Sequence, residues 1–206
     1  MCGILRWILL VLVRAAEGLM RTLVLGPKRR PTTPKSASRQ CQRGLIVLGS
    51  MKTLGVISDT HGLLREDAVA LLQGVDHIVH AGDIGNPTII ERLERVAPVS
   101  AIRGNVDVEP WASMFPDTLQ VTLFGQKIFV VHNRKDMTFA PAMMGINLVI
   151  SGHSHRAIIE SCDEAIYLNP GSAGPRRFRV PITLAMVQII HGRLVPKIYE
   201  IASDLH

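Results

Sequence analysis

The sequence predicts an α/β protein with two mixed sheets and flanking helices, and three observations carry this prediction. From residue 51 onward, short Val/Ile/Leu runs alternate with helical stretches, which is typical of parallel βαβ units. Later runs come in pairs separated by turn residues, which is typical of hairpins. Side chains able to bind metal follow several of the runs directly. At 206 residues, the chain is long enough for one domain with a sizeable core.

The first half of the domain reads as βαβαβ. Residues 54–58 form the first predicted strand, followed by a helix over 66–73 and a strand over 77–81. The next helix begins at Asn86-Pro87, with asparagine as the N-cap and proline at the first helical position, and runs to about residue 95. Residues 99–103 form the third strand. This order predicts a parallel arrangement of the three strands.

The second half contains more paired strands. The strands predicted at 119–124 and 127–132 flank Gly125-Gln126, which suits a type II′ turn. Residues 148–151 and 165–169 follow as further strands, and the strands over 183–190 and 194–201 turn at His191-Gly192. A parallel half joined to paired strands predicts a core between two sheets, with helices outside. We interpret the methionines at positions 137, 143 and 144 as core filling.

Charge is distributed unevenly along the chain. Residues 1–50 hold nine of the 23 basic residues and one of the 17 acidic residues, so this segment carries +8. The remaining 14 basic and 16 acidic residues leave the segment from Met51 onward at −2, and all eight histidines lie there. The high pI of about 9.7 therefore comes from the first fifty residues. We expect no nucleic-acid binding by the domain.

The predicted domain organisation is a segment over residues 1–50 and a domain over residues 51–206. The first segment is either a basic extension, disordered where Pro, Ser and basic residues dominate at 26–44, or the product of a start codon placed too far upstream. Its apolar stretch at 7–13 is far shorter than the roughly 20 residues of a membrane helix. The three cysteines do not form a disulfide framework, which favours a reducing cytoplasm.

Seven side chains able to bind metal stand at the ends of apolar runs. They are Asp59, His61, Asp83, Asn105, His132, His153 and His155. Each alone has an ordinary explanation, such as a turn for Gly82-Asp83. In open α/β sheets, however, ligand sites gather beyond the carboxyl ends of the strands, so five such strand ends would bring these groups together. Their joint occurrence in this order favours metal binding.

The donor set indicates the kind of metal. Two carboxylates, one amide oxygen and four imidazoles divide naturally between two ions, with one aspartate able to bridge them. Nitrogen and oxygen ligands without thiolate suit Mn, Fe, Zn or Co better than Ca or Mg, and we predict two divalent ions, Mn²⁺ first, with Fe, Zn, Co or Ni as alternatives. Two ions about 3.5–4 Å apart activate a water and hold both oxygens of an in-line displacement. That chemistry suits phosphate ester hydrolysis.

Five segments together resemble the calcineurin-like metallophosphoesterases, most closely the small bacterial and archaeal phosphodiesterases of the YfcE type. The segments are Ser58-Asp59-Thr60-His61-Gly62, Ala81-Gly82-Asp83, Arg103-Gly104-Asn105-Val106-Asp107, Gly152-His153-Ser154-His155 and Asn169-Pro170-Gly171-Ser172. The resemblance spans nearly all of residues 51–201 and none of the first fifty. It implies a four-layer αββα sandwich with a dinuclear site at one edge of the two sheets, and a dimer or tetramer.

The resemblance also implies roles for the seven side chains. Asp59, His61 and His155 would hold one ion. Asn105, His132 and His153 would hold the other, with Asp83 as the bridge. The implied activity is that of a cytoplasmic phosphodiesterase in which a metal-bridging hydroxide attacks a small phosphate ester, with no membrane partner. The alternative is a non-catalytic interaction scaffold similar to the retromer small subunit. Because this sequence has a residue able to bind metal at all seven ligand positions, the enzyme is favoured over the scaffold.

Two departures from the family pattern affect details. Val106 stands where relatives that hydrolyse phosphoproteins carry a histidine that protonates the leaving group, so we expect a preference for esters with good leaving groups. Asn133 replaces the glycine that usually follows the ligand His132, and asparagine is expected to tolerate a positive φ there. Arg134 and Lys135 next to it either contact substrate phosphate or are solvated.

Several nearby residues have open interpretations. Asp107 either orients a ligand or is a solvated turn residue, and His80 is either packed or supports a ligand. The segment 169–172 is interpreted as a structural turn near the site. The basic cluster at 176–179 is interpreted as an exposed loop, with binding of an anionic substrate as the alternative.

Overall fold

The structure is a computed structural model that describes residues 51–176 and 179–201. The predictions for residues 1–50 lie outside the described residues. In the described part, no helix is both long and apolar enough to cross a membrane.

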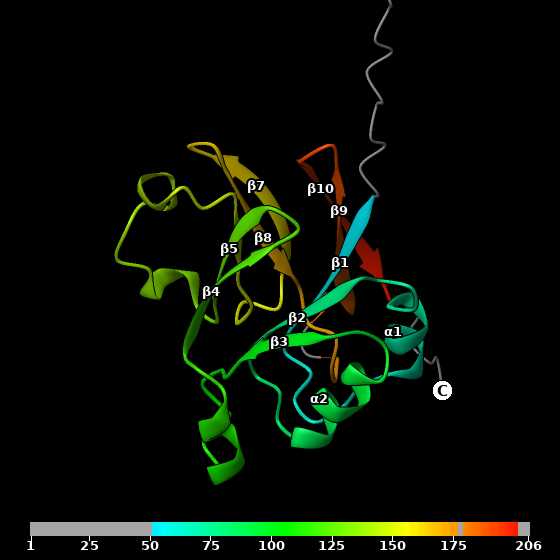
Figure 1. The fold of residues 1–206 in the computed structure, drawn as a ribbon. Helices are drawn as coiled ribbons and strands as arrows, with labels where there is room; N and C mark the ends of the chain where they lie inside the picture. The colour runs from blue at the N-terminus through cyan, green and yellow to red at the C-terminus, as the bar shows by residue number, and fades with distance from the viewer. Residues whose placement is uncertain (1–50, 177–178, 202–206) are drawn as a thin grey trace, which may run out of the picture. The chain divides into compact units, whose positions relative to one another are not determined.

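Two five-stranded mixed sheets form the framework (Figure 1). Sheet A contains, in spatial order, β10 (Arg193–Glu200), β9 (Thr183–Ile190), β1 (Lys52–Ile57), β2 (His77–Ala81) and β3 (Val99–Ile102). Sheet B contains β4 (Thr118–Leu123), β5 (Gln126–Val131), β6 (Leu148–Ile150), β8 (Ala165–Pro170) and β7 (Ala157–Cys162). Strands β1, β2 and β3 are parallel, and so are β5, β6 and β8.

The main core lies between the two sheets because alternate residues of each strand point to opposite faces. Leu54, Val56 and Val79 of sheet A pack in one cluster with Ile150 and Leu168 of sheet B. A second cluster covers the other face of sheet A. There it joins strand residues to α1 (Glu66–Leu71) and α2 (Pro87–Glu94), which lie on the side of sheet A away from sheet B (Figure 1).

The predicted start of α2 is confirmed in detail. The side chain of Asn86 accepts a hydrogen bond from the backbone N–H of Thr88 at 2.9 Å, and Pro87 is the first helical residue. This cap satisfies one of the backbone donors that a helix start leaves free. Ile89, Ile90 and Leu93 form the buried face of the helix.

The outer face of sheet B is covered differently from that of sheet A. A third cluster there contains Phe129, Val149 and Ile146, with Met137 and Tyr167 packed against it. The short 3₁₀ helices η2 (Arg134–Asp136) and η3 (Pro141–Met144) lie in the connection from β5 to β6, and a third, η1 (Pro110–Met114), connects β3 to β4. The predicted two mixed sheets and flanking helices are confirmed. The fourth layer, outside sheet B, is the connection from β5 to β6.

Two local predictions are wrong, and one strand was not predicted. The β4–β5 turn is Phe124-Gly125, with φ values of 53° and 78°, because Phe124 packs against the core between the sheets. Two positive φ values define a type I′ turn. Strand β7 was missed, since its residues are almost all exposed and its turn to β8 contains neither Gly nor Asn. Met143 and Met144 are not core residues, being 87% and 49% exposed, because η3 presents them to solvent.

Candidate metal centre

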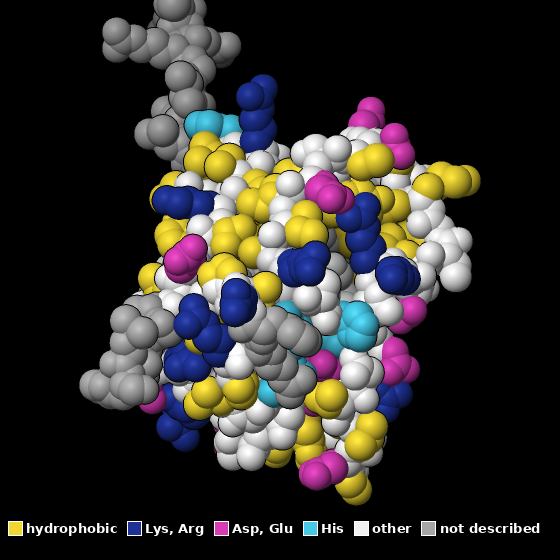
Figure 2. All heavy atoms as spheres, turned by 180° about the vertical axis from the view of Figure 1, so that it is seen from behind, with side chains coloured by type: hydrophobic (Ala, Val, Ile, Leu, Met, Phe, Trp, Pro, Cys, Tyr) yellow, Lys and Arg dark blue, Asp and Glu magenta, His cyan; other side chains and the backbone are white. Residues whose placement is uncertain are grey.

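The seven side chains come together where the carboxyl ends of parallel strands in the two sheets meet. Asp59 and His61 follow β1, Asp83 follows β2, and Asn105 follows β3. The remaining ligands come from sheet B: His132 follows β5, and His153 and His155 follow β6. Several histidine side chains reach the surface at one place, with Lys and Arg side chains beside them (Figure 2).

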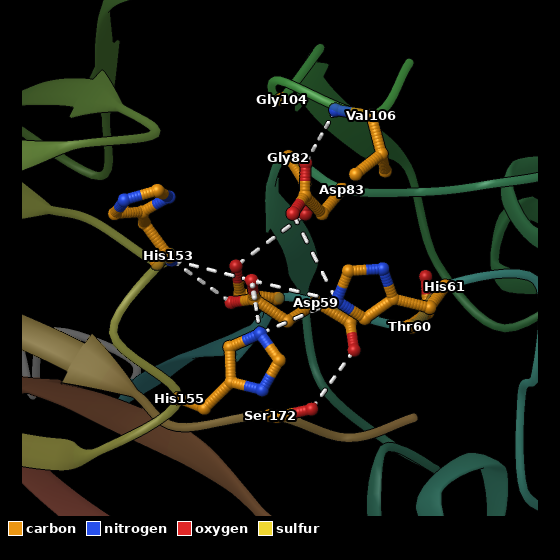
Figure 3. A network of polar contacts seen from close by, with 12 residues as sticks. Asp59, Thr60, His61, Gly82, Asp83, Gly104, Val106, His153, His155 and Ser172 are labelled. Carbon is orange, nitrogen blue, oxygen red and sulfur yellow. Dashed lines mark hydrogen bonds and ion pairs between the residues drawn. The ribbon is translucent and has the colours of Figure 1, made fainter. Parts of the chain in front are cut away.

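One group of possible ligands is built around Asp59, whose side chain is fully buried. Nε2 of His155 lies 3.2 Å from Oδ1 of Asp59 and 3.2 Å from Nε2 of His61. In Figure 3, these three side chains point toward one another from the ends of β1 and β6. Their ligand atoms all lie within 4.8 Å of one another, a spacing that one metal ion can span.

A second group is built around Asp83. Its Oδ1 lies 3.3 Å from Nε2 of His132, and its Oδ2 lies 3.8 Å from Nε2 of His61. Asn105 adds an amide oxygen that is 3.1 Å from Nε2 of His132 and 3.1 Å from Nδ1 of His153. Asp59, Asp83 and His132 also have ligand atoms within 4.8 Å of one another, so Asp59 belongs to both groups. The two groups are therefore contiguous.

His132 is oriented by the backbone. Its Nδ1 lies 2.7 Å from the carbonyl oxygen of Ala81, so Nδ1–H donates to that oxygen and Nε2 faces Asp83. Metal-binding histidines commonly donate their second ring N–H in this way, which sets the tautomer. Burial lowers the pKa of His132, but the hydrogen bond and charge of Asp83 outweigh burial and raise it. Burial raises the pKa of Asp83, and His132 outweighs that effect and lowers it.

The backbone at these positions is unusual. In the described part of the chain, nine residues other than glycine have positive φ. Four of them lie in two-residue hairpin turns: Phe124, Asp163, Glu164 and His191. The other five are candidate ligands: Asp59, His61, Asp83, His153 and His155. Left-handed backbone costs of order 1–2 kcal/mol for such residues, and it concentrates at functional sites.

Glycines allow the strand ends to approach closely enough to share one site. A Cβ atom at Gly104 would overlap the carboxylate and backbone of Asp83, and one at Gly152 would overlap the side chains of Ser58 and Asp59. The Gly-Asn and Gly-His pairs of the sequence therefore have a steric reason. A side chain at either glycine would separate ligands that now lie side by side.

Asp107 is not a solvated turn residue, because its side chain is buried. Its carboxylate accepts hydrogen bonds from the backbone N–H groups of Ile84, Gly85 and Gly104 at 2.8–2.9 Å. Among the described residues, it makes no hydrogen bond to the side chain of a candidate ligand. Asp107 ties the loop after Asp83 to the loop that carries Asn105, and so positions both ligands through the backbone.

A buried polar network supports Asp59 and His61 through the residue between them. The hydroxyl of Thr60 lies 2.9 Å from the carbonyl oxygen of Ile84 and 3.0 Å from Nε2 of His80. Since the hydroxyl has one hydrogen, which it donates to the carbonyl, Nε2–H of His80 is the donor to Thr60. Burial lowers the pKa of His80 to about 4, so this histidine is neutral.

The segment from Asn169 to Ser172 supports the site through hydrogen bonds from the side of sheet B. The hydroxyl of Ser172 donates to the carbonyl oxygen of Asp59 at 3.0 Å. The side-chain amide of Asn169 donates to the carbonyl oxygen of Gly152 at 2.6 Å and lies 3.1 Å from the hydroxyl of Ser154. The segment therefore holds both the Asp59 loop and the loop of His153 and His155. Its interpretation as a structural turn agrees with these contacts.

The residues after His132 differ from expectation. Asn133 has a φ of −107°, so no positive φ is required there, and its side chain instead caps η2 by accepting from the N–H of Lys135 at 3.1 Å. Arg134 is not free in solvent, because it pairs with Glu160 at 2.6 Å and lies over the ring of Tyr167. Arg176 and Arg179 are exposed, as an open loop predicts.

The seven residues fit divalent metal ions by chemistry and by geometry. Their ligand atoms are carboxylate oxygens, an amide oxygen and imidazole nitrogens, and the nitrogen of His132 that faces the site is the one left free by the Ala81 contact. Nitrogen and oxygen donors of this kind suit divalent transition-metal ions, and a bound cation would compensate the charge of the buried Asp59 and Asp83. Fold and site together define an α/β protein with a candidate metal centre whose possible ligands come from both sheets.

Comparison with known proteins agrees with this class. The calcineurin-like phosphoesterase superfamily domain matches residues 51–192. A probable metallophosphoesterase of Methanocaldococcus jannaschii is 31% identical over 171 residues, covering 76% of this chain and 85% of the relative. Phosphodiesterase YfcE of Escherichia coli is 30% identical over 161 residues, covering 66% of this chain and 88% of the relative. The chain belongs to the calcineurin-like phosphoesterase superfamily.

Solved structures share the fold. The structure of the Escherichia coli phosphoesterase YfcE matches with a TM-score of 0.51 and 26% identity, covering 73% of this chain and all of that chain (100%). A predicted phosphoesterase of Streptococcus pneumoniae matches with a TM-score of 0.60 at 22% identity, covering 76% of this chain and 95% of that chain. Vacuolar protein sorting 29 of Cryptosporidium parvum matches with a TM-score of 0.59 at 15% identity, covering 74% of this chain and 99% of that chain. The last two show the fold alone.

Proposed function

We propose that this protein is a phosphodiesterase that uses two divalent metal ions, Mn²⁺ in the first instance. The observation that carries the proposal is the convergence of all seven predicted ligands from five strand ends into two contiguous groups. Membership of the phosphoesterase superfamily and the relatives named phosphodiesterase support it. Bound ions would activate water as the nucleophile and neutralise charge on the phosphate.

In this proposal, Asp59, His61 and His155 hold one ion, Asn105, His132 and His153 hold the other, and Asp83 lies between them. The hydrogen bond from Nδ1 of His132 to Ala81 leaves Nε2 of His132 available to a metal ion. Asp107 holds the loop of Asp83 and the loop of Asn105 together. Because Asn105 is exposed at the site, its side chain is also available to donate to a phosphate oxygen. The side chains thus position the phosphate as well as the ions.

The shape of the surface favours a diester over a monoester. A pocket of about 210 Å³ contains candidate ligands of both groups, including His61, Asp83 and His155. His153 lines this pocket and also two neighbours of about 530 Å³ and 310 Å³. A phosphate at the ligands would therefore have two recesses next to it, one for each ester arm.

The surroundings of the site also bear on the leaving group. Val106 lines the ligand pocket, and its backbone N–H donates to Oδ1 of Asp83 at 3.1 Å. Its aliphatic side chain cannot donate a proton. We therefore propose that leaving groups that depart as stable anions, such as p-nitrophenolate, are preferred over alkoxides.

The test is hydrolysis of bis-p-nitrophenyl phosphate by the metal-free protein titrated with Mn²⁺. We expect metal-dependent turnover, and a fall in kcat of at least about 100-fold in both Asp83→Asn and His132→Ala, because each removes a ligand. Calorimetric titration with Mn²⁺ should show two ions bound by the wild type and weaker binding by both variants. Lys197→Ala, on the β10 surface beside Tyr199, serves as the matched control and should retain turnover.

A negative result would also be informative. If Mn²⁺, Ni²⁺, Co²⁺ and Zn²⁺ all fail to support turnover by the folded protein, the phosphodiesterase proposal is wrong. The non-catalytic scaffold on the same fold would then be the better account.

A further inference from the structure

We propose that the pocket of about 530 Å³ beside His153 is the subsite for one ester arm of the substrate, and that it takes an arm ending in a planar aromatic group such as a nucleobase. This inference rests on the proposed function, because it places the phosphate at the metal ligands. The volume lies in the usual range of small-molecule pockets, roughly 300–1,000 Å³.

The pocket is continuous with the metal centre. Gly152, His153 and Ser154 form one side of it, and His153 and Ser154 also line the pocket that contains the candidate ligands. Tyr167 and Ile158 of the β7–β8 hairpin and Arg134 also line the pocket. A phosphate held by the ligands would therefore direct one of its ester oxygens toward this pocket.

The wall of the pocket contains a planar cation held in place by two contacts. The guanidinium carbon of Arg134 lies 4.0 Å from the ring centroid of Tyr167, which is a stacking distance. Its Nη1 donates to Oε2 of Glu160 at 2.6 Å, and this ion pair helps to hold the guanidinium over the ring of Tyr167. An arginine fixed in this way presents a flat delocalised surface, and nucleobases stack on such guanidinium planes as they do on aromatic rings.

The charge of the pocket suits a phosphate-bearing ligand. Lys135 lines it as a positive charge, Arg134 lines it while paired with Glu160, and among the residues that the structure describes no carboxylate lines the pocket. Apolar contact comes from Ile158, which is 39% exposed, and from the ring of Tyr167. Figure 2 shows hydrophobic and basic side chains next to the exposed histidines, as this combination requires. An aliphatic arm would gain the apolar contact but not the stacking.

The test compares two phosphate monoesters as inhibitors of the Mn²⁺-loaded protein. Adenosine 5′-monophosphate and methyl phosphate share the group that would bind the metals and differ in the arm. We expect the inhibition constant of adenosine 5′-monophosphate to be at least about 10-fold lower than that of methyl phosphate, consistent with stacking contributions of about 1–3 kcal/mol per base. Hydrolysis of bis-p-nitrophenyl phosphate provides the readout.

The decisive variant is Arg134→Lys, which keeps the positive charge and removes the planar surface. We expect the ratio of the two inhibition constants to fall below about 3 in this variant and to stay at the wild-type value in Lys197→Ala. If the ratio stays high in Arg134→Lys, the proposal that the guanidinium of Arg134 is the stacking surface is wrong. A wild-type ratio near one, with normal turnover, would overturn the subsite and leave the proposed function intact.

If the protein shows no turnover, this result contradicts the proposed function and does not test the subsite. Calorimetric binding of the same two compounds to the Mn²⁺-loaded protein would then decide the subsite directly. Preference for adenosine 5′-monophosphate that is lost in Arg134→Lys would support the pocket, and equal binding would overturn it.

Discussion

At the scale of single residues, the site depends on side chains placed where the backbone favours glycine. Asp59, His61, Asp83, His153 and His155 all have positive φ, and all five are candidate ligands, a role that glycine cannot fill. Their glycine neighbours remove bulk where two loops touch. The cost of the strained backbone is offset by the hydrogen bonds that define each loop, among them those from the N–H groups of residues 59 and 61 to the loop after β2. The proposed metal binding would account for side chains at these positions of positive φ.

His80 gives a prediction about stability and pH. Its pKa is about 4 in the folded protein and about 6.5 in the unfolded chain, so stability is complete above pH 6.5 and is lost as pH falls from 6.5 toward 4. Between pH 7 and 4.5, this linkage removes about 2–3 kcal/mol of the free energy of unfolding. In His80→Gln, which retains an N–H donor for Thr60, that part of the pH dependence should disappear. Urea unfolding at several pH values measures it, and equal slopes in both proteins would contradict the assignment.

At the scale of elements, the loops after β2 and β3 act as one unit. Asp107 accepts three backbone hydrogen bonds across the two loops, and Val106 N–H bonds Asp83 from the same segment. On the other side, the Asn169–Ser172 segment joins the loops after β1 and β6. The ligands are thus carried on loops that are held by buried polar contacts between neighbouring elements.

Replacing Asp107 tests this unit. Asp107→Asn removes the charge and turns an N–H₂ group toward backbone N–H donors, so we expect the free energy of unfolding to fall by about 2 kcal/mol. Mn²⁺ affinity should also fall, because Asp83 and Asn105 lose their common support. Asp163→Asn, in the exposed β7–β8 turn, is the matched control and should change stability by less than about 0.5 kcal/mol. Unaltered stability and metal affinity in Asp107→Asn would show that the two loops are held in another way.

At the scale of the whole molecule, the core between the sheets determines how the two halves of the site meet. Asp59 and Asp83 come from sheet A, whereas His132, His153 and His155 come from sheet B. Only the packing of the two inner faces brings these groups within reach of one another.

The dimer or tetramer and the cytoplasmic location stay predictions.

Ile150 is a test of that packing, since it is fully buried between the sheets and ends the strand before His153. Ile150→Ala should lower the free energy of unfolding by about 2–5 kcal/mol through lost burial and a residual cavity. Val195→Ala, on β10 and 46% exposed, should cost less than about 0.5 kcal/mol. Chemical denaturation of both variants measures the difference. Similar losses in both would mean that the core between the sheets is not the main source of stability.

The elements that the sequence predicted well are those with strong local signals. Asn86-Pro87 predicts the start of α2 because a cap and a proline act within one turn. The strand over His77–Ala81 agrees with prediction because its β-branched pair Ile78-Val79 is a local strand signal and is buried. Strand β7 and the Phe124-Gly125 turn were missed because pairing with β8 and packing on the core decide them, and neither leaves a local pattern. The same holds for the pocket beside His153, whose wall joins Arg134 to Tyr167 from a different strand.

The sequence by itself determined the identity of the seven candidate ligands and their position at strand ends, because metal chemistry restricts residue type and strand signals are local. The tertiary structure decided which ligands lie together, that Asp107 holds two loops, and that Asn133 caps η2 with negative φ. It also decided that Arg134 lies on Tyr167 beside the metal centre. These features depend on distances between residues far apart in the chain, which only the packing of two sheets defines.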